Sequence, residues 1–218
     1  MGYREGEFEA FGVSLKERAA RFTESIALIR QLWTGEKVTF HGKFYRVTDH
    51  AISHAPARPG GPPVWVAGLV EAAVRRAARI GDGWLIANAT TMGATKPLME
   101  VYRKALAEYG KTPAEFPIAR ECYVGDSNAT AMEECRGPLE YKYASYAAWG
   151  MESPTKDMSF EEMARDRFIV GDKVKVKEEI ARWKEELGVD HFSMRVQWPG
   201  LPQEKVLASI RRLGEIFA

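Results

Sequence analysis

The stretch from residue 63 to residue 86 constrains the fold of this chain more than any other part. Residues 64–66 form a β-branched and aromatic run without a polar residue, which predicts a strand covered on both faces. Gly68 ends this run, a short amphipathic helix opens at Glu71, and residues 84–86 predict a second buried strand. The order strand, helix, strand is typical of a βαβ unit with parallel strands.

The turn that leads into this helix is a candidate anion site. The first N–H groups of a helix have no partner within it and lie at the positive end of its dipole. Those of Leu69, Val70 and Glu71 could therefore converge on a phosphate. The alternative is an ordinary crossover that binds nothing, and it stays open for this unit taken alone.

Composition limits the class of protein. The 218 residues, 45% of them hydrophobic, predict one globular domain that spans residues 1–218. The 31 Lys and Arg against 30 Asp and Glu leave a net charge of +1, so charge gives no reason to expect nucleic acid or an acidic membrane as a partner. No apolar run is long enough to span a bilayer, and no signal-peptide pattern is visible.

Metal, redox and nucleophilic chemistry have no recognisable motif. Cys122 and Cys135 are spaced like neither a redox dithiol nor a zinc knuckle, and we expect a reduced, cytoplasmic setting. The histidines lack metal-ligand spacing, so no metal site is predicted. They are His41, His50, His54 and His191. No Ser-His-Asp set or carboxylate pair can be identified, so the catalytic residues stay unknown.

Strands and helices alternate along the rest of the chain. We expect helices over 14–35, 98–110, 128–150 (bent or broken near Gly137 and Pro138), 176–188 and from 203 on, a hairpin over 38–47, and strands over 118–124 and 191–197. The last helix is expected to bury Val206, Ile210, Leu213 and Phe217. Residues 151–160 are expected to form a loop or mobile insertion. The alternation predicts an α/β fold with parallel strands.

Four strands with their helices form either half of a (β/α)₈ barrel or a small open sheet, and the residues alone do not decide. In both folds a ligand binds beyond the carboxyl ends of the strands. Arg120, Arg195, Gln197 and Trp198 lie at or near predicted strand ends, as does Glu121, and they are candidates for a substrate pocket. Arg195 could bind an anionic substrate group or pair with a carboxylate in the barrel, which is the commoner fate of a strand arginine.

Short motifs occur in a fixed order across nearly the whole chain. They are Gly2-Tyr3-Arg4 and the segments 7–8, 11–12, 29–34, 41–45, 62–68, 75–84 and 187–192. Each is weak alone, but their order and spacing resemble the C-terminal half of the luciferase-like monooxygenase family. That family consists of flavin- and deazaflavin-dependent oxidoreductases built on a TIM barrel.

The resemblance implies a partial TIM (β/α)₈ barrel, roughly the C-terminal half with about four parallel strands. It implies FMN or the deazaflavin coenzyme as cofactor, with the phosphate near Ala67, Gly68, Leu69 and Val70 and with Tyr3 as a second phosphate contact. Many relatives have serine at one or both of the positions of Leu69 and Val70. Here only backbone N–H groups and the helix dipole remain to hold the phosphate.

The resemblance also implies that a first half of the barrel is missing ahead of this chain. We therefore expect a fragment or a chain that completes its pocket by pairing. Open sheet edges favour a homodimer or pairing with another chain, and a small molecule is the expected substrate. The expected function is a luciferase-like oxidoreductase or monooxygenase. The alternatives are a non-catalytic flavin-binding or assembly module, or an inactive truncated product.

Overall fold

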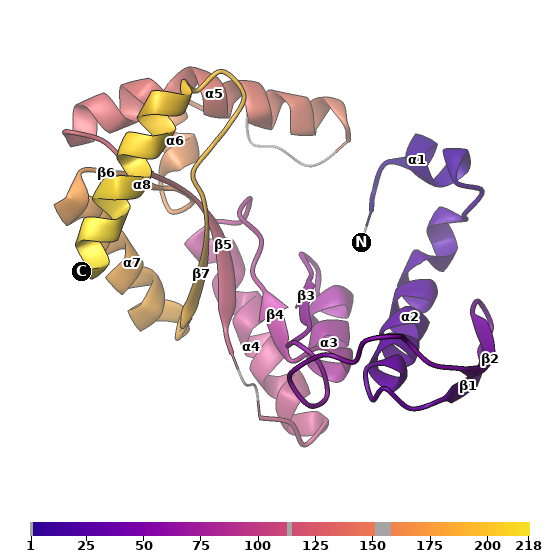
Figure 1. Ribbon diagram of the computed structural model, residues 1–218. Coiled ribbons are helices and arrows are strands. Elements are labelled where there is room, and N and C mark those ends of the chain that lie inside the picture. Colours follow the sequence, from indigo (N-terminus) through magenta and orange to yellow (C-terminus); the bar gives the residue numbers. More distant parts are fainter. Residues whose placement is uncertain (1, 113–114, 151–157) are drawn as a thin grey trace.

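The computed structural model describes residues 2–112, 115–150 and 158–218. Parallel strands form its centre, and helices that follow them in sequence pack along one side of these strands (Figure 1). The four predicted strands are β3 (Trp65–Ala67), β4 (Gly83–Leu85), β5 (Pro117–Val124) and β7 (His191–Arg195). The α/β class with parallel strands is therefore confirmed.

β5 is the strand on which the others converge. Its first half pairs with β7, and its last three residues pair with a further parallel strand, β6 (Ile169–Gly171). A parallel bridge between Ile86 and Ile118 joins the end of β4 to β5, and β3 pairs with β4. The order β3, β4, β5, β7 thus brings all four carboxyl ends to one edge.

The predicted βαβ unit is present, with α3 (Glu71–Ile80) as its helix. A Cβ atom at Gly68 would lie 2.8 Å from the Cβ of Ala73, so the turn packs directly on the first turn of α3. Trp84 donates its indole N–H to the carbonyl oxygen of Gly68 at 3.0 Å. The turn is held from both sides, and close packing requires glycine there.

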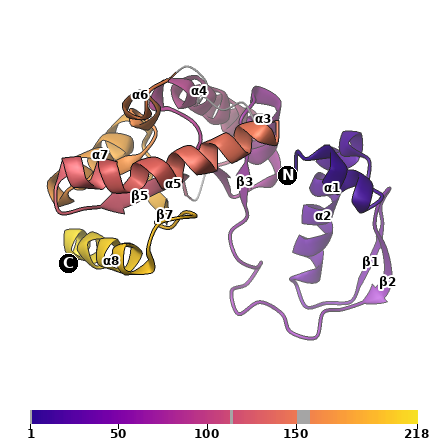
Figure 2. The same ribbon diagram turned by 90° about the horizontal axis from the view of Figure 1, so that it is seen from above.

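The other helices surround this centre. Seen from above, α5 crosses β5 and β7, while α2 and the hairpin lie on the opposite side of the molecule from α8 (Figure 2). The hairpin pairs β1 (Val38–His41) with β2 (Arg46–His50). The helices are α1 (Glu5–Ala10), the 3-10 turn η1 (Leu15–Glu17), α2 (Arg18–Leu32), α4 (Met92–Glu108), α5 (Asn128–Ala148), α6 (Phe160–Ala164), α7 (Lys173–Leu187) and α8 (Gln203–Phe217).

Two helices differ from their predicted ranges. α4 begins at Met92, ahead of the predicted start at residue 98, because the Thr91 side chain accepts a hydrogen bond from the Ala94 N–H and caps the helix. α5 runs unbroken through Gly137 and Pro138.

α8 buries less than predicted. Val206 is buried, but Ile210 and Phe217 are 43% and 66% exposed. The prediction for these two residues is wrong because only one narrow stripe of α8 faces β5, where the Ser209 hydroxyl accepts a hydrogen bond from the Val124 N–H at 2.8 Å.

The segment 151–160 lies largely outside the described residues. At its end, Ser159 and Glu162 form a capping box that starts α6. Neither α6 nor β6 is predicted from the sequence, because both are only three to five residues long.

One face of β3 is open, as is one face of β7. Val66 is 1% exposed and packs with the buried side chains of α3 and α4, whereas Ala67, the next residue, is exposed. The prediction that this strand is covered on both faces is therefore wrong. The β-branched side chain turns to the helices, and its neighbour points the other way. None of the helices in the described part of the chain is long and apolar enough to cross a membrane.

Candidate functional site

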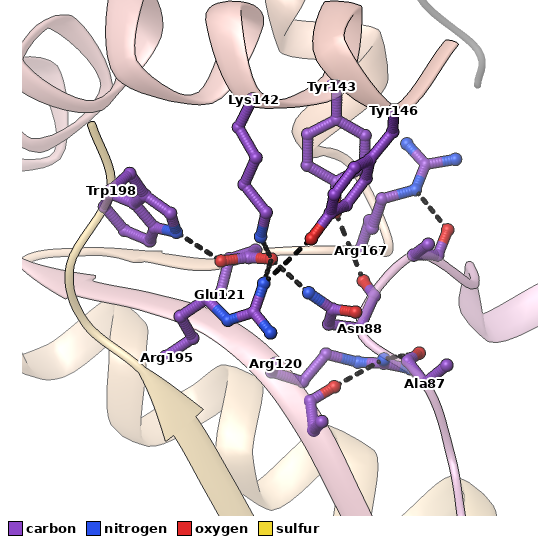
Figure 3. Close-up of polar contacts among 12 residues, drawn as sticks. Ala87, Asn88, Arg120, Glu121, Lys142, Tyr143, Tyr146, Arg167, Arg195 and Trp198 are labelled. Carbon is purple, nitrogen blue, oxygen red and sulfur yellow. Dashed lines mark hydrogen bonds and ion pairs between the residues drawn. The ribbon is translucent and has the colours of Figure 1, made fainter. Parts of the chain in front are cut away.

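A buried carboxylate lies at the carboxyl ends of the strands, beneath α5 (Figure 3). Glu121 of β5 is 0% exposed. Its oxygens accept hydrogen bonds from Asn88 Nδ2, Lys142 Nζ and Trp198 Nε1. These donors come from the loop after β4, from α5 and from the loop after β7. A single side chain of the central strand therefore joins three elements that surround the mouth of the fold.

Arg195 is the cation of this cluster that reaches solvent. Its side chain is 48% exposed, and its Nη1 lies 3.9 Å from Glu121 Oε1. The same nitrogen donates to the Tyr146 hydroxyl at 3.1 Å. Partial burial would lower the pKa of Arg195, but the Tyr146 hydrogen bond and the charge of Glu121 outweigh it and raise that pKa. Arg195 thus stays charged and partly exposed to solvent.

Lys142 is a buried partner of Glu121. Burial lowers the pKa of Lys142 to about 8, although the charge and hydrogen bond of Glu121 act in the opposite direction. The lysine ammonium is therefore close to losing its proton near neutral pH.

Arg120 belongs to the other face of β5. It is 0% exposed, and its guanidinium lies 3.8 Å from the ring centroid of Trp183 in α7. Burial lowers its pKa to about 9. Its Nη1 donates to the carbonyl oxygens of Ala87 at 2.7 Å and Ala119 at 2.8 Å, and its Nε and Nη2 have no partner in the described structure. Arg120 therefore touches the loop behind the site and does not reach the open face.

The loop after β4 is fixed by three consecutive carbonyl oxygens. Arg120 binds that of Ala87, and the Tyr143 hydroxyl donates to that of Asn88 at 3.4 Å. Arg167 Nε donates to that of Ala89 at 2.9 Å. Since Arg120 and Arg167 are both buried, the loop holds the Asn88 side chain against Glu121 from a rigid backbone.

The open face between these strand ends carries small side chains. Ala119 and Glu121 are two residues apart on β5 and so point to the same face, and they pair with Ser193 and Arg195 of β7. On β3, Ala67 points to this face as well, away from buried Val66. This face therefore carries small side chains on β3, β5 and β7.

The predicted phosphate turn lies at the same edge. Leu69 and Val70 are 45% and 62% exposed, and Val70 is the N-cap of α3 with extended backbone. No side chain caps this helix, although the Val70 carbonyl oxygen accepts from the N–H groups of Ala73 and Val74. The first amides of α3 therefore face solvent beside exposed Ala67.

Tyr3 lies in the extended segment before α1 and is 40% exposed. The next residue, Arg4, places its guanidinium 4.8 Å from the ring centroid of Trp149 at the end of α5. The N-terminal segment thus contacts the helix that covers Glu121.

The structure brings Arg195 and Trp198 together around Glu121. Gln197 is exposed and donates to the carbonyl oxygen of Trp198 at 3.2 Å, whereas Arg120 faces the helices. Sequence reasoning placed Glu121 near a strand end as a residue that could line a pocket, but did not predict that it joins the cluster. It missed Lys142, Tyr146 and Arg167. The burial of Lys142 could have been predicted from helical spacing, because Lys142 lies on the same stripe of α5 as the apolar residues Leu139 and Tyr143, which are buried.

Parallel strands with a polar cluster at their carboxyl ends define an α/β protein of the kind found among barrel enzymes. Residues 1–191 match the family described as luciferase-like monooxygenase. The chain belongs to this family, and the predicted resemblance is confirmed.

The chain is similar to several characterised proteins. It is 32% identical over 205 residues to an F420-dependent glucose-6-phosphate dehydrogenase of Nakamurella multipartita. The matched region covers 88% of this chain and 58% of that protein. It is 35% identical over 125 residues to an F420-dependent hydroxymycolic acid dehydrogenase of Mycobacterium tuberculosis, over 56% of this chain and 33% of that protein. The chain thus spans little more than half the length of the first of these relatives.

Solved structures share the fold. The monooxygenase RslO1 of Streptomyces bottropensis superposes with a TM-score of 0.84 at 23% identity, over 98% of this chain and 65% of that one. An F420-dependent secondary alcohol dehydrogenase in complex with an F420-acetone adduct superposes with a TM-score of 0.72 at 19% identity, over 93% of this chain and 62% of that one. At these identities the likeness concerns the fold alone.

Proposed function

We propose that this chain is the cofactor-holding part of an oxidoreductase that uses the deazaflavin coenzyme F420 or FMN. The observation that carries the proposal is the meeting of two features at one edge of the strands. One is the uncapped amino end of α3, and the other is the polar cluster around Glu121. Membership of the luciferase-like family and the F420-dependent relatives support it.

The residues at the amino end of α3 fit an anionic cofactor tail. The exposed turn of Ala67, Gly68, Leu69 and Val70 offers backbone N–H groups and the positive end of the helix dipole. A side chain at position 68 would push α3 away, so the turn depends on glycine. We propose Tyr3 as a second contact to the phosphate.

The bound cofactor would supply hydride transfer, and this chain's residues would position the reactants. Its ring system would lie over the small side chains of Ala67, Ala119 and Ser193. Arg195 is half exposed and would bind a polar group of a small-molecule substrate, with Gln197 beside it. Trp198 and Arg120, both buried, would act as positioning residues for Glu121 and for the loop of Asn88.

The proposal is tested by calorimetric titration of the chain with FMN and, in a separate experiment, with F420. Val70→Asp places a negative charge at the amino end of α3 and should weaken binding at least about tenfold, because a like charge faces the phosphate. Val174→Asp is the matched control, since Val174 lies in the first turn of α7 and is 67% exposed. The proposal would be contradicted if neither cofactor binds, or if both variants lose cofactor affinity to the same extent.

A module that holds the cofactor without turning over substrate is the second candidate. It is favoured by the coverage, because the chain spans only 58% of the Nakamurella relative. Reduction of F420 by glucose 6-phosphate, followed by absorbance, separates the two. Binding with turnover supports the enzyme, and binding without turnover supports the module.

A further inference from the structure

A groove runs between α2 and α3, on the outer side of the molecule away from the Glu121 cluster. It has a volume of about 690 Å³. Figure 1 shows α2 standing beside α3 at this place. Small side chains make the hollow: Ala19, Ala20, Thr23, Ala27 and Ala72. This volume lies within the range of about 300–1,000 Å³ that small-molecule sites have.

Arginines line this groove without carboxylate partners. Arg76 and Arg79 of α3 lie on its wall. Arg75, on the same wall, is paired with Glu108. Among the described residues, Arg76, Arg79 and the nearby Arg18 form neither an ion pair nor a side-chain hydrogen bond. The Nε of Arg76 is moreover buried without a partner.

The unpaired cations are close enough to repel one another. Burial lowers the pKa of Arg76, and the charges of Arg79 and Arg18 lower it further. The acid on the groove wall, Glu24, is already occupied, since it accepts the backbone N–H groups of Lys43, Phe44 and Tyr45. No other lining residue is acidic. The groove therefore concentrates positive charge in a chain whose net charge is only +1.

We propose that the groove between α2 and α3 binds a small molecule that carries a diphosphate group, with Arg76 and Arg79 as its principal ligands and Arg18 at its rim. The guanidinium groups match phosphate oxygens in geometry and charge. The neighbouring Tyr109 hydroxyl adds a donor at the groove wall. This site lies about one to two helical turns beyond the amino end of α3, so it does not depend on the cofactor proposal.

The test is calorimetric titration of the full chain with inorganic pyrophosphate and, in a second arm, with ADP. Arg76→Gln and Arg79→Gln should each weaken pyrophosphate binding about tenfold or more, because each removes a charge-assisted contact. Arg136→Gln, which removes the same charge from an exposed ion pair on α5, should leave the affinity unchanged. Tighter binding of ADP would identify a nucleotide as the source of the diphosphate, and equal binding would identify the free anion.

Three results would overturn the proposal. They are absence of binding by the wild-type chain, equal loss in the Arg136→Gln control, and undiminished binding by the double variant Arg76→Gln/Arg79→Gln. The last result would place the anion elsewhere, for instance at the amino end of α3. The proposal would also be overturned if, without any ligand, the wild-type chain is a dimer and the double variant is a monomer. The arginines would then pair with acidic residues of a second copy and not with a ligand.

Discussion

At the scale of single residues, the Glu121 cluster shows what a strand pattern leaves undecided. Arg120 and Glu121 are neighbours on β5, so one faces the helices and the other the open side. The sequence predicts their place near a strand end but not which of them turns inward. Both are fully buried, which their charges alone argue against. Their burial depends on partners that lie 21 to 77 positions away in the chain, such as Lys142 and Trp198.

We expect Glu121→Gln to lower the free energy of unfolding by about 3–5 kcal/mol, because the change leaves Lys142 as a buried cation without its carboxylate. Urea unfolding measures this. The double variant Glu121→Gln/Lys142→Met should recover part of the loss, since it removes both charges. Glu140→Gln, at an exposed position of the same helix α5, should change stability by less than about 0.5 kcal/mol. A single and a double variant of equal stability would argue against a coupled pair.

Lys142 should titrate near neutral pH. Its pKa of about 8 lies below the value of about 10.4 for a free lysine, mainly because of burial. Between these values the unfolded chain binds more protons, so the contribution of this group to stability rises with pH in that window. The Cε chemical shift of Lys142 in ¹³C-lysine-labelled protein, assigned with Lys142→Arg, should show a midpoint near 8. Since Glu121 raises this pKa, the midpoint should fall further in Glu121→Gln, and an unchanged midpoint would contradict the assignment.

At the scale of elements, the βαβ unit could be predicted because its signals are local. Apolar strand residues, a glycine and an amphipathic stripe all lie within residues 63–86. β6 and α6 could not be predicted in this way. β6 has three residues and is specified by its pairing with the end of β5. The unbroken course of α5 through Pro138 likewise depends on burial of Leu139 and Tyr143, which no local rule includes.

The carboxyl end of α3 offers a test at this scale. Lys111 Nζ donates to the carbonyl oxygens of Ala78 at 2.9 Å and Gly81 at 2.6 Å, next to the last turn of the helix. Lys111→Met should lower the free energy of unfolding by about 1–2 kcal/mol, because it removes a cation and hydrogen bonds from a helix C-terminus. Lys177→Met, at an exposed position of α7, serves as control in the same thermal unfolding experiment. Equal effects of the two changes would show that the contact is not stabilising.

At the scale of the whole molecule, β3 and β7 each have an exposed face, whereas the carboxyl half of β5 is buried on both faces. The sequence predicts the parallel strands. The residues of a strand such as β3, however, do not reveal that one of its two faces is exposed. α8 likewise has an uncovered apolar side, because Ile210 and Phe217 point away from its packed side.

We expect the purified chain to associate with itself. β3 and β7 end the described order of the four strands, so each has one edge without a strand partner in the described structure. Light scattering over a range of concentrations should show a mass that rises from one chain toward two. The variant Ser193→Arg adds bulk and charge on the exposed face of β7, one of these two edge strands, and should reduce the association. A mass of one chain at all concentrations would contradict this prediction.

The position of β5 has a consequence for motion. It is hydrogen-bonded along both edges, and all but one of its residues are buried. Its amide protons should therefore exchange with deuterated solvent more slowly than those of β3 or β7. Glu121 would thus stand on a strand that opens more slowly than β3 or β7, and binding a ligand beside it would cost little further ordering of the protein.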